Sequence, residues 1–215
     1  MTQIVTLVGD LGAGKTTLGA VLGMIVKYNV PGSAAVSNVA VPDCQNVEDI
    51  HKFVAIKLIK RDKRYAFCLD DEAAQAGLES RGSYTKASAI ESRIITHARK
   101  AHVDLVLISQ LKSMLDKRAQ WVEDFSILCE AVFEAGNMTS IPDYFHYTCY
   151  DKYLEAFNEF DLETEDMLRY VWSRMDTDDI PFFEAFKREF ISYYDISPDD
   201  MDQWDRTMAD AIQKR

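Results

Sequence analysis

The sequence predicts an α/β fold in which a mostly parallel β-sheet is flanked by helices. Three observations lead to this prediction. Short apolar or β-branched runs alternate with segments of helical spacing along residues 1–150. Several of these runs are apolar on both faces, which is typical of parallel strands covered by helices on both sides. A glycine-rich loop follows the first run, and the 215 residues suffice for one such domain with a helical appendage.

The individual elements follow from these patterns in chain order. Strands are expected at residues 4–8, 34–39, 65–69, 103–109 and 125–133, with residues 144–150 forming a sixth strand or a hairpin at the rim. Helices are expected at residues 15–28, 46–61 and 86–101. This alternation favours a doubly covered sheet over an all-helical or all-β architecture.

The pattern changes after residue 150. Aromatic and acidic residues alternate through 153–157 and 182–186, and Trp172 and Trp204 add large apolar surfaces. We therefore expect a core at residues 1–150 and an acidic, aromatic-rich helical extension of two or three helices at residues 151–215. The extension either packs on the core or forms a docking or subunit interface.

Charge is distributed unevenly along the chain. The net charge is −11, but the segment from Asp151 onward holds eight basic and eighteen acidic residues, which leaves the first 150 residues near −1. Two basic stretches, 52–64 and 86–118, lie in this first part. The overall acidity therefore does not exclude a nucleic-acid partner for the core.

Composition also bears on the compartment. The four cysteines form no CxxC pair, so we expect reduced thiols and neither a disulfide framework nor a zinc site. The sequence shows no apolar stretch long enough for a membrane span and no signal-peptide pattern. We expect a cytoplasmic protein, in the host cytoplasm if it is viral, with virion association as an alternative.

The glycine-rich loop predicts a nucleotide site. It reads Gly9, Asp10, Leu11, Gly12, Ala13, Gly14, Lys15, Thr16, and Thr17 follows it. Glycines allow positive φ, so backbone N–H groups can approach phosphate oxygens, and the helix that follows directs its positive end at the same anion. In this P-loop, or Walker A, pattern the lysine reaches the β- and γ-phosphates and Thr16 ligates Mg²⁺. ATP and Mg²⁺ are the expected ligands, and the expected fold is a mostly parallel sheet of the RecA/ASCE-like P-loop NTPase type.

A second motif supports hydrolysis of the nucleotide. The apolar strand expected at 65–69 ends in Asp70, Asp71 and Glu72. One carboxylate would hold the hydrated Mg²⁺ and the next would polarise the attacking water, as in a Walker B element. The favoured register gives Asp71 the metal and Glu72 the catalytic base, and the alternative makes Asp70 the metal ligand.

Gln110 is a third candidate. It follows the apolar strand expected at 103–109. An amide at the end of a buried strand can sense the γ-phosphate or orient the water. A solvent-facing residue at a strand end is an equally good interpretation of this position.

Together these motifs resemble the FtsK/HerA superfamily of DNA-pumping ATPases. The resemblance rests on the Walker A loop, the strand followed by Asp70-Asp71-Glu72-Ala73, the basic helix ending at Arg99-Lys100, and the strand ending at Ser109-Gln110. Within that superfamily the chain is most similar to genome-packaging ATPases of membrane-containing viruses. It is also similar to the Zot-like morphogenesis ATPases of filamentous phage, on Ser37-Asn38 and on residues 114–118.

The resemblance implies a motor with named site residues. The chain would translocate double-stranded DNA as a homo-oligomeric ring, and capsid or portal-like proteins are further expected partners. Asp71, Glu72 and Gln110 match the hydrolytic residues. Arg99 matches an arginine that reaches a neighbouring subunit's nucleotide. Arg118, Arg93 and Arg81 compete for that role.

Other functions remain alternatives at this stage. Lys112, Lys117 and Arg118, or the segment 81–83, are candidates for a loop that grips DNA phosphates. A Zot-like virion-assembly ATPase is an alternative to the packaging motor, and a P-loop small-molecule kinase is another. A switch GTPase would need an Asn-Lys-x-Asp motif that the sequence lacks.

Overall fold

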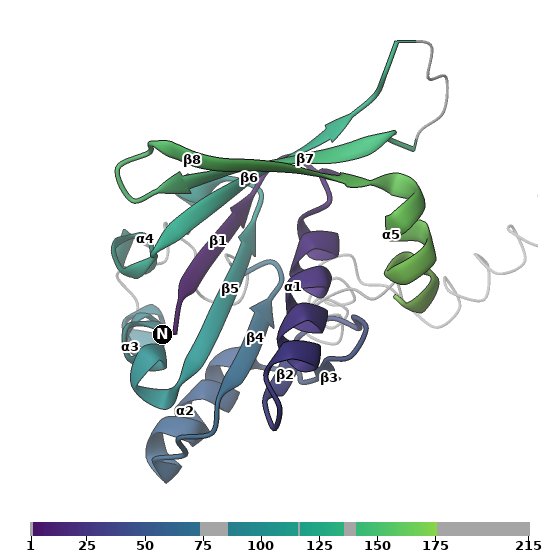
Figure 1. Cartoon of the computed structure of the whole chain (residues 1–215). Helices are drawn as coiled ribbons and strands as arrows, with labels where there is room; N and C mark the ends of the chain where they lie inside the picture. The colour runs from purple at the N-terminus through teal and green to yellow at the C-terminus, as the bar shows by residue number, and fades with distance from the viewer. Residues whose placement is uncertain (1, 74–85, 116, 136–140, 176–215) are drawn as a thin grey trace, which may run out of the picture. The chain divides into compact units, whose positions relative to one another are not determined.

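A computed structural model describes residues 2–73, 86–115, 117–135 and 141–175 (Figure 1). The described residues lie within one compact unit that spans residues 1–179.

An eight-stranded sheet forms the centre of this unit, in the order β3-β2-β4-β5-β1-β6-β7-β8. The strands are β1 (Ile4–Val8), β2 (Ala34–Ser37), β3 (Gln45–Asn46), β4 (Ala66–Asp70), β5 (Val103–Ser109), β6 (Phe125–Val132), β7 (Tyr144–Asp151) and β8 (Ala156–Glu163). Strands β1 to β6 pair in parallel, and β7 and β8 add antiparallel pairs at one edge. The predicted fold class, a mostly parallel sheet of the RecA/ASCE-like P-loop NTPase type, is confirmed.

Helices cover the sheet in two layers. They are α1 (Lys15–Asn29), α2 (Ile50–Lys60), α3 (Lys86–Ala98), α4 (Lys117–Val122) and α5 (Thr164–Tyr170), with short 3₁₀ turns η3 (Arg99–Ala101), η4 (Lys112–Met114) and η5 (Trp172–Arg174). One apolar cluster lies between the sheet and α1 and α5. The other lies between the sheet and α2, α3 and α4. The buried residues of β1, β4 and β5 therefore divide between two distinct helical layers.

Most of the predicted boundaries are close to the observed ones. The strands at 4–8 and 103–109 match β1 and β5. The helix expected at 46–61 begins later, at Ile50, because the Asp49 carboxylate accepts a hydrogen bond from the Lys52 N–H and so caps the helix.

The prediction that a helical extension begins at residue 151 is wrong. Residues 156–163 form β8, which pairs with β7, so the sheet continues past residue 150. The signal was present, because Phe160 and Leu162 alternate with the acidic residues Glu159, Asp161 and Glu163, which is the period of a strand. Helix α5 follows β8 directly, and the remainder of the extension, residues 176–215, lies outside the described residues.

The parallel strands place the predicted motifs at one end of the sheet. Val8 pairs with Ser109, and Asp70 pairs with Leu107, so the residues after β1, β4 and β5 meet at the carboxyl ends of these strands. Helix α1 begins at the same end (Figure 1). The sequence motifs thus converge although they lie far apart in the chain.

Candidate active site

The loop between β1 and α1 depends on its glycines. Gly9, Gly12 and Gly14 have φ values of 151°, 79° and 78°. A Cβ at Gly9 would lie 2.2 Å from the Cys129 carbonyl oxygen of β6, and one at Gly14 would lie 2.6 Å from the Phe145 ring of β7. The loop can therefore pack against β6 and β7 only without side chains at these two positions.

The Lys15 ammonium lies within the loop. Its Nζ donates hydrogen bonds of 2.8 Å and 2.7 Å to the carbonyl oxygens of Gly9 and Asp10. Burial lowers the pKa of Lys15, while the nearby acidic groups, among them Asp71 and Glu72, oppose this shift. The ammonium is thus held where the loop closes, beside the carboxylates that follow β4.

Thr16 and Asp71 are brought into direct contact. The Thr16 hydroxyl at the start of α1 donates a 2.6 Å hydrogen bond to Asp71 Oδ2. Asp71 is 8% exposed, and burial raises its pKa, although the hydrogen bond from Thr16 opposes the rise. These are the two side chains that the sequence assigned to Mg²⁺, and the favoured register places Asp71 beside Thr16.

Asp70 points to the opposite face of the sheet. Its Oδ2 lies 3.1 Å from His51 Nε2 of α2, and both side chains are buried. Because successive strand residues face opposite sides, Asp71 reaches α1 whereas Asp70 reaches α2. The geometry therefore favours Asp71 over Asp70 as the partner of Thr16.

Asn38 at the end of β2 organises both aspartates. Its amide nitrogen donates hydrogen bonds of 3.1 Å to Asp70 Oδ1 and of 2.8 Å to the Asp71 carbonyl oxygen. Its Oδ1 accepts a hydrogen bond of 2.7 Å from the Asp71 N–H. Ser37-Asn38 contributed to the resemblance to Zot-like ATPases, but no role was predicted for Asn38. A polar pair ending an otherwise apolar strand was the available signal.

Glu72 follows in the left-handed region, with φ 53°. The Ala73 N–H donates 3.0 Å to the Ile108 carbonyl, which ties this turn to β5. Burial raises the pKa of the Glu72 carboxyl, and the neighbouring Asp71 raises it further. A carboxyl with a raised pKa at this position is suited to accept a proton.

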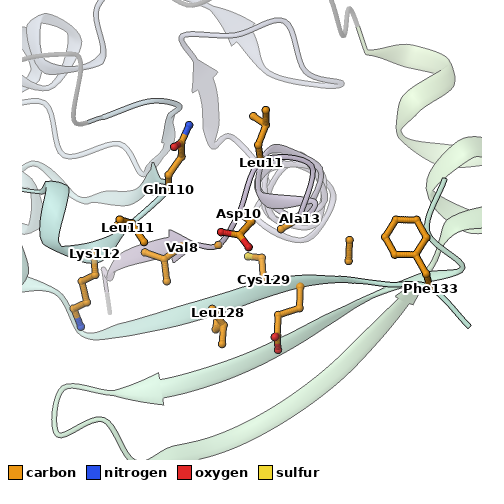
Figure 2. Close-up of a pocket in the computed structure, with 13 residues that line it drawn as sticks. Val8, Asp10, Leu11, Ala13, Gln110, Leu111, Lys112, Leu128, Cys129 and Phe133 are labelled. Atoms are coloured by element: carbon orange, nitrogen blue, oxygen red, sulfur yellow. The ribbon is translucent and has the colours of Figure 1, made fainter. Parts of the chain in front are cut away.

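Gln110 lies on the segment that borders the loop. Its carbonyl oxygen accepts a 3.2 Å hydrogen bond from the Gly9 N–H, and its side chain is exposed. It lines a cavity of about 450 Å³ together with loop residues such as Asp10 and the β6 residues Leu128 and Cys129 (Figure 2). The structure thus places Gln110 beside the loop, with its amide directed to solvent.

Lys112 was a candidate for a loop that grips DNA phosphates, but its ammonium is paired within the chain. Its ammonium forms an ion pair with the buried Glu123 carboxylate, which also accepts a 2.8 Å hydrogen bond from the Thr6 hydroxyl of β1. In Figure 2 its side chain extends away from Asp10. Because a buried carboxylate needs a partner, Lys112 is engaged within the chain.

Arg99 lies at the other end of the sheet. It precedes β5, and its guanidinium donates hydrogen bonds of 2.8 Å to the Val122 carbonyl oxygen and of 2.7 Å to Asp124 Oδ1. Asp124 Oδ2 accepts from the N–H of Ile4, where β1 begins. The chain therefore does not bring Arg99 to its own loop. Of the competing arginines, Arg93 is exposed, Arg118 is partly buried and Arg81 lies outside the described residues.

Thr17 is supported by residues that the sequence analysis did not include in the site. Its hydroxyl accepts a 2.9 Å hydrogen bond from the Trp172 indole N–H. Trp172 packs edge-on against Phe145 at 5.8 Å between ring centroids, and the Tyr147 hydroxyl donates 3.2 Å to the Gly14 carbonyl. These contacts cross up to 155 residues of sequence, so no local pattern announces them.

The sheet order, the positive-φ loop at the start of α1 and the acidic strand end define a P-loop NTPase fold. No protein-family model matches the chain. No curated protein matches it either. Within the part of the chain that the structure describes, no helix is long and apolar enough to cross a membrane.

Two solved structures show the similarity in fold. One is the genome packaging NTPase B204 from Sulfolobus turreted icosahedral virus 2 in complex with ATP-gammaS, with 16% identity, 75% of this chain and 97% of that chain covered, and a TM-score of 0.51. The other is the N-terminal domain of zonular occludens toxin from Neisseria meningitidis, with 12% identity, 79% and 98% covered, and a TM-score of 0.50. The resemblance to packaging and Zot-like ATPases is thus confirmed for the fold.

Proposed function

We propose that this protein is an ATPase that translocates double-stranded DNA, and that it packages a viral genome into a capsid. The observation that carries the catalytic part is the 2.6 Å hydrogen bond between Thr16 and Asp71. It joins the hydroxyl at the start of the P-loop helix to the carboxylate at the end of β4, with Glu72 next in the chain. P-loop NTPases hold Mg²⁺ with a hydroxyl and a carboxylate at these two positions.

Nucleotide binding would use the loop and the start of α1. The N–H groups of residues 14–17, where the loop enters α1, would donate to the phosphates, and the positive end of α1 would add to this attraction. Lys15 would exchange the carbonyl oxygens of Gly9 and Asp10 for β- and γ-phosphate oxygens. Burial lowers the pKa of Lys15, and the surrounding carboxylates oppose this shift by favouring the charged form.

The residues present fit a magnesium ion. Mg²⁺ prefers oxygen donors and takes one or two protein ligands, with phosphates and water supplying the others. Thr16 and Asp71 supply a hydroxyl and a carboxylate already in contact. When bound, the ion neutralises charge that develops on the phosphate oxygens.

Glu72 would act as the general base. It would accept the proton of the attacking water, and Gln110 would orient that water or sense the γ-phosphate. Arg99 stays the predicted arginine that acts on a neighbour's nucleotide. To reach it, the guanidinium would have to leave Asp124 and the Val122 carbonyl.

Two observations support the DNA-translocating part. The neighbour with a TM-score of 0.51 is described as a genome packaging NTPase, and its fold covers 75% of this chain. The acidic residues concentrate after residue 150, so the P-loop core is nearly neutral and has basic segments. We infer a homo-oligomeric ring around the DNA, with capsid or portal-like proteins as further partners.

The catalytic proposal is tested by Glu72→Gln. Removing the base should lower ATP turnover about 100-fold or more while binding of a fluorescent ATP analogue persists. Glu48→Gln, the same chemical change at an exposed site away from the loop, should leave turnover unchanged. Unchanged turnover in Glu72→Gln would show that another residue is the base.

The DNA part is tested separately on the wild-type protein. Long duplex DNA should stimulate ATP turnover, and the stimulation should weaken with salt. If ATP turnover does not change with DNA but requires a small phosphate acceptor, the protein is a small-molecule kinase and not a DNA translocase.

A further inference from the structure

Five exposed cations gather where β4 and β5 begin, at the opposite end of these strands from the P-loop. This amino-end patch is Lys60, Arg61, Lys63, Arg64 and Lys100. Helix α2 ends next to the start of β4, and η3 ends next to the start of β5 (Figure 1). The Ala66 N–H donates 3.0 Å to the His102 carbonyl, which joins the two segments. The two basic stretches of the sequence therefore meet on one surface.

The loop from α2 to β4 is held by internal contacts. The buried Lys57 ammonium donates 2.8 Å to the Arg64 carbonyl and lies 3.8 Å from Asp62 Oδ2. Asp62 also accepts hydrogen bonds from the Arg64 backbone N–H and guanidinium at 2.7–3.1 Å. These hydrogen bonds hold the pKa of Asp62 well below its usual range. The one acidic residue of this loop is therefore used inside it.

A second contact joins the loop to η3. The Lys63 ammonium donates 3.1 Å to the Lys100 carbonyl. Lys63 thus sits over the η3 segment, and Lys100 lies on the same surface. The patch is a fixed arrangement of two neighbouring segments.

The acidic side chains beside the patch are engaged in internal contacts: Asp62 with Lys57 and Arg64, and Asp104 with the Tyr65 hydroxyl. The sequence has 35 acidic and 24 basic residues, yet among the described residues only Arg64 of the five patch side chains forms a salt bridge. Like charges close together repel, and the carboxyl end of α2 favours cations only at Lys60 and at its C-cap, Arg61. A polyanionic partner would offset the repulsion.

We propose that the amino-end patch contacts the phosphates of duplex DNA. This inference rests on the proposed function and places the DNA contact away from the nucleotide loop. The segments 61–64 and 99–102 present cations with no exposed large apolar side chain, whereas membrane-docking surfaces add apolar residues that insert. Two exposed isoleucines, Ile56 and Ile59, lie on α2, and Ile59 immediately precedes Lys60. The cations are suited to sequence-independent phosphate contacts.

This surface differs from the DNA-gripping loop that the sequence suggested. Lys112 of that loop is paired with Glu123. Lys117 is exposed at the start of α4 and remains the competing contact. A DNA contact at the amino-end patch and one at Lys117 therefore predict loss of duplex binding in different variants.

The test compares two triple variants of the full chain with equal charge changes. Lys60→Ala/Lys63→Ala/Lys100→Ala removes three patch cations. Lys52→Ala/Lys117→Ala/Lys152→Ala removes three exposed lysines elsewhere, including the competing one. Affinity for a labelled duplex of random sequence is measured by fluorescence anisotropy over a range of salt. Basal ATP turnover and circular dichroism check that each variant is folded.

The patch variant should bind the duplex about tenfold more weakly or worse. The slope of log affinity against log salt should fall by about 2 to 3, since each lost phosphate contact removes about 0.9. Basal turnover should stay unchanged, and Lys→Arg at the same three positions should restore binding. The control variant should bind like the wild type.

Three results would overturn the proposal. Loss of binding in the control variant alone would place the contact at the loop that holds Lys117 and leave the proposed function intact. Binding to phosphatidylserine vesicles is measured for the same variants. If the patch variant loses vesicle binding but keeps duplex binding, the patch is a lipid-binding surface. A wild-type protein that binds no duplex at low salt would remove the DNA part of the proposed function and the patch with it.

Discussion

At the scale of single residues, the P-loop depends on side chains far along the chain. The Trp172 N–H donates to the hydroxyl of Thr17, and Phe145 and Tyr147 pack where a side chain at Gly14 would lie. Thr17 is 6% exposed, so its hydroxyl would lack a partner without the indole. The segment after β8 thereby stabilises the start of α1.

Replacing Trp172 with Phe should lower the free energy of unfolding by about 1 kcal/mol. An aromatic ring stays, but the smaller phenyl group loses the hydrogen bond to Thr17 and part of the packing against Phe145. Urea unfolding measures the change, and a double-mutant cycle with Thr17→Val isolates the pair. The matched control is Trp121→Phe, because Trp121 is 79% exposed and should change stability by less than about 0.5 kcal/mol. Strictly additive effects in the cycle would contradict the coupling.

At the scale of elements, α1 lies close against β4 because it carries a glycine at the contact. A Cβ at Gly19 would lie 2.5 Å from Leu69 Cδ1, and Leu69 is fully buried. The close approach places the Thr16 end of α1 near the end of β4, where Asp71 lies. Helix packing and the candidate metal site are thus linked.

Gly19→Ala should destabilise the fold by about 1–2 kcal/mol. Overpacking costs about 1–3 kcal/mol, and the better helix propensity of alanine offsets up to about 1 kcal/mol. Thermal and urea unfolding give the difference. Leu69→Val in the same chain should recover part of the loss, because it makes room for the new methyl group. If Gly19→Ala raised stability, the contact would be looser than the structure shows.

At the scale of the whole molecule, the sheet separates two surfaces. The P-loop, Asp71 and Gln110 lie at the carboxyl ends of the strands, while Arg99 and the amino-end patch lie at the amino ends. Arg99 and the P-loop of the same subunit lie at opposite ends of the sheet. If Arg99 has the role that the resemblance implies, it therefore acts on ATP bound to a neighbouring subunit. The proposed ring therefore predicts activity that depends on assembly.

ATP turnover per chain should rise with protein concentration as the ring forms. Assembly by mass action has this consequence when the site needs a second subunit. Turnover is measured over a range of concentrations beside sedimentation of the same samples. Constant turnover in a sample that sediments as a monomer would contradict a shared site.

Local patterns predicted much of this fold. The limits of β1 and β5 were correct because both strands are mostly apolar runs, and the glycine positions gave the loop its positive φ values. Strand β8 was missed because its aromatic and acidic residues were grouped with the helices that were expected after residue 150. The roles of Trp172 and Asn38 could not be predicted, because their partners lie 155 and 32–33 residues away in sequence.

Residue types at short spacings are enough to define the P-loop, the acidic end of β4 and the alternation that makes the sheet. The contact of Thr16 with Asp71 and not with Asp70 follows from the packing of the elements, since it depends on which face of β4 is covered by α1. The same packing also pairs Lys112 with Glu123 and brings two basic segments together at the amino ends. Contacts of this kind depend on strand order and on the helix that covers each face, and neither is encoded at short range.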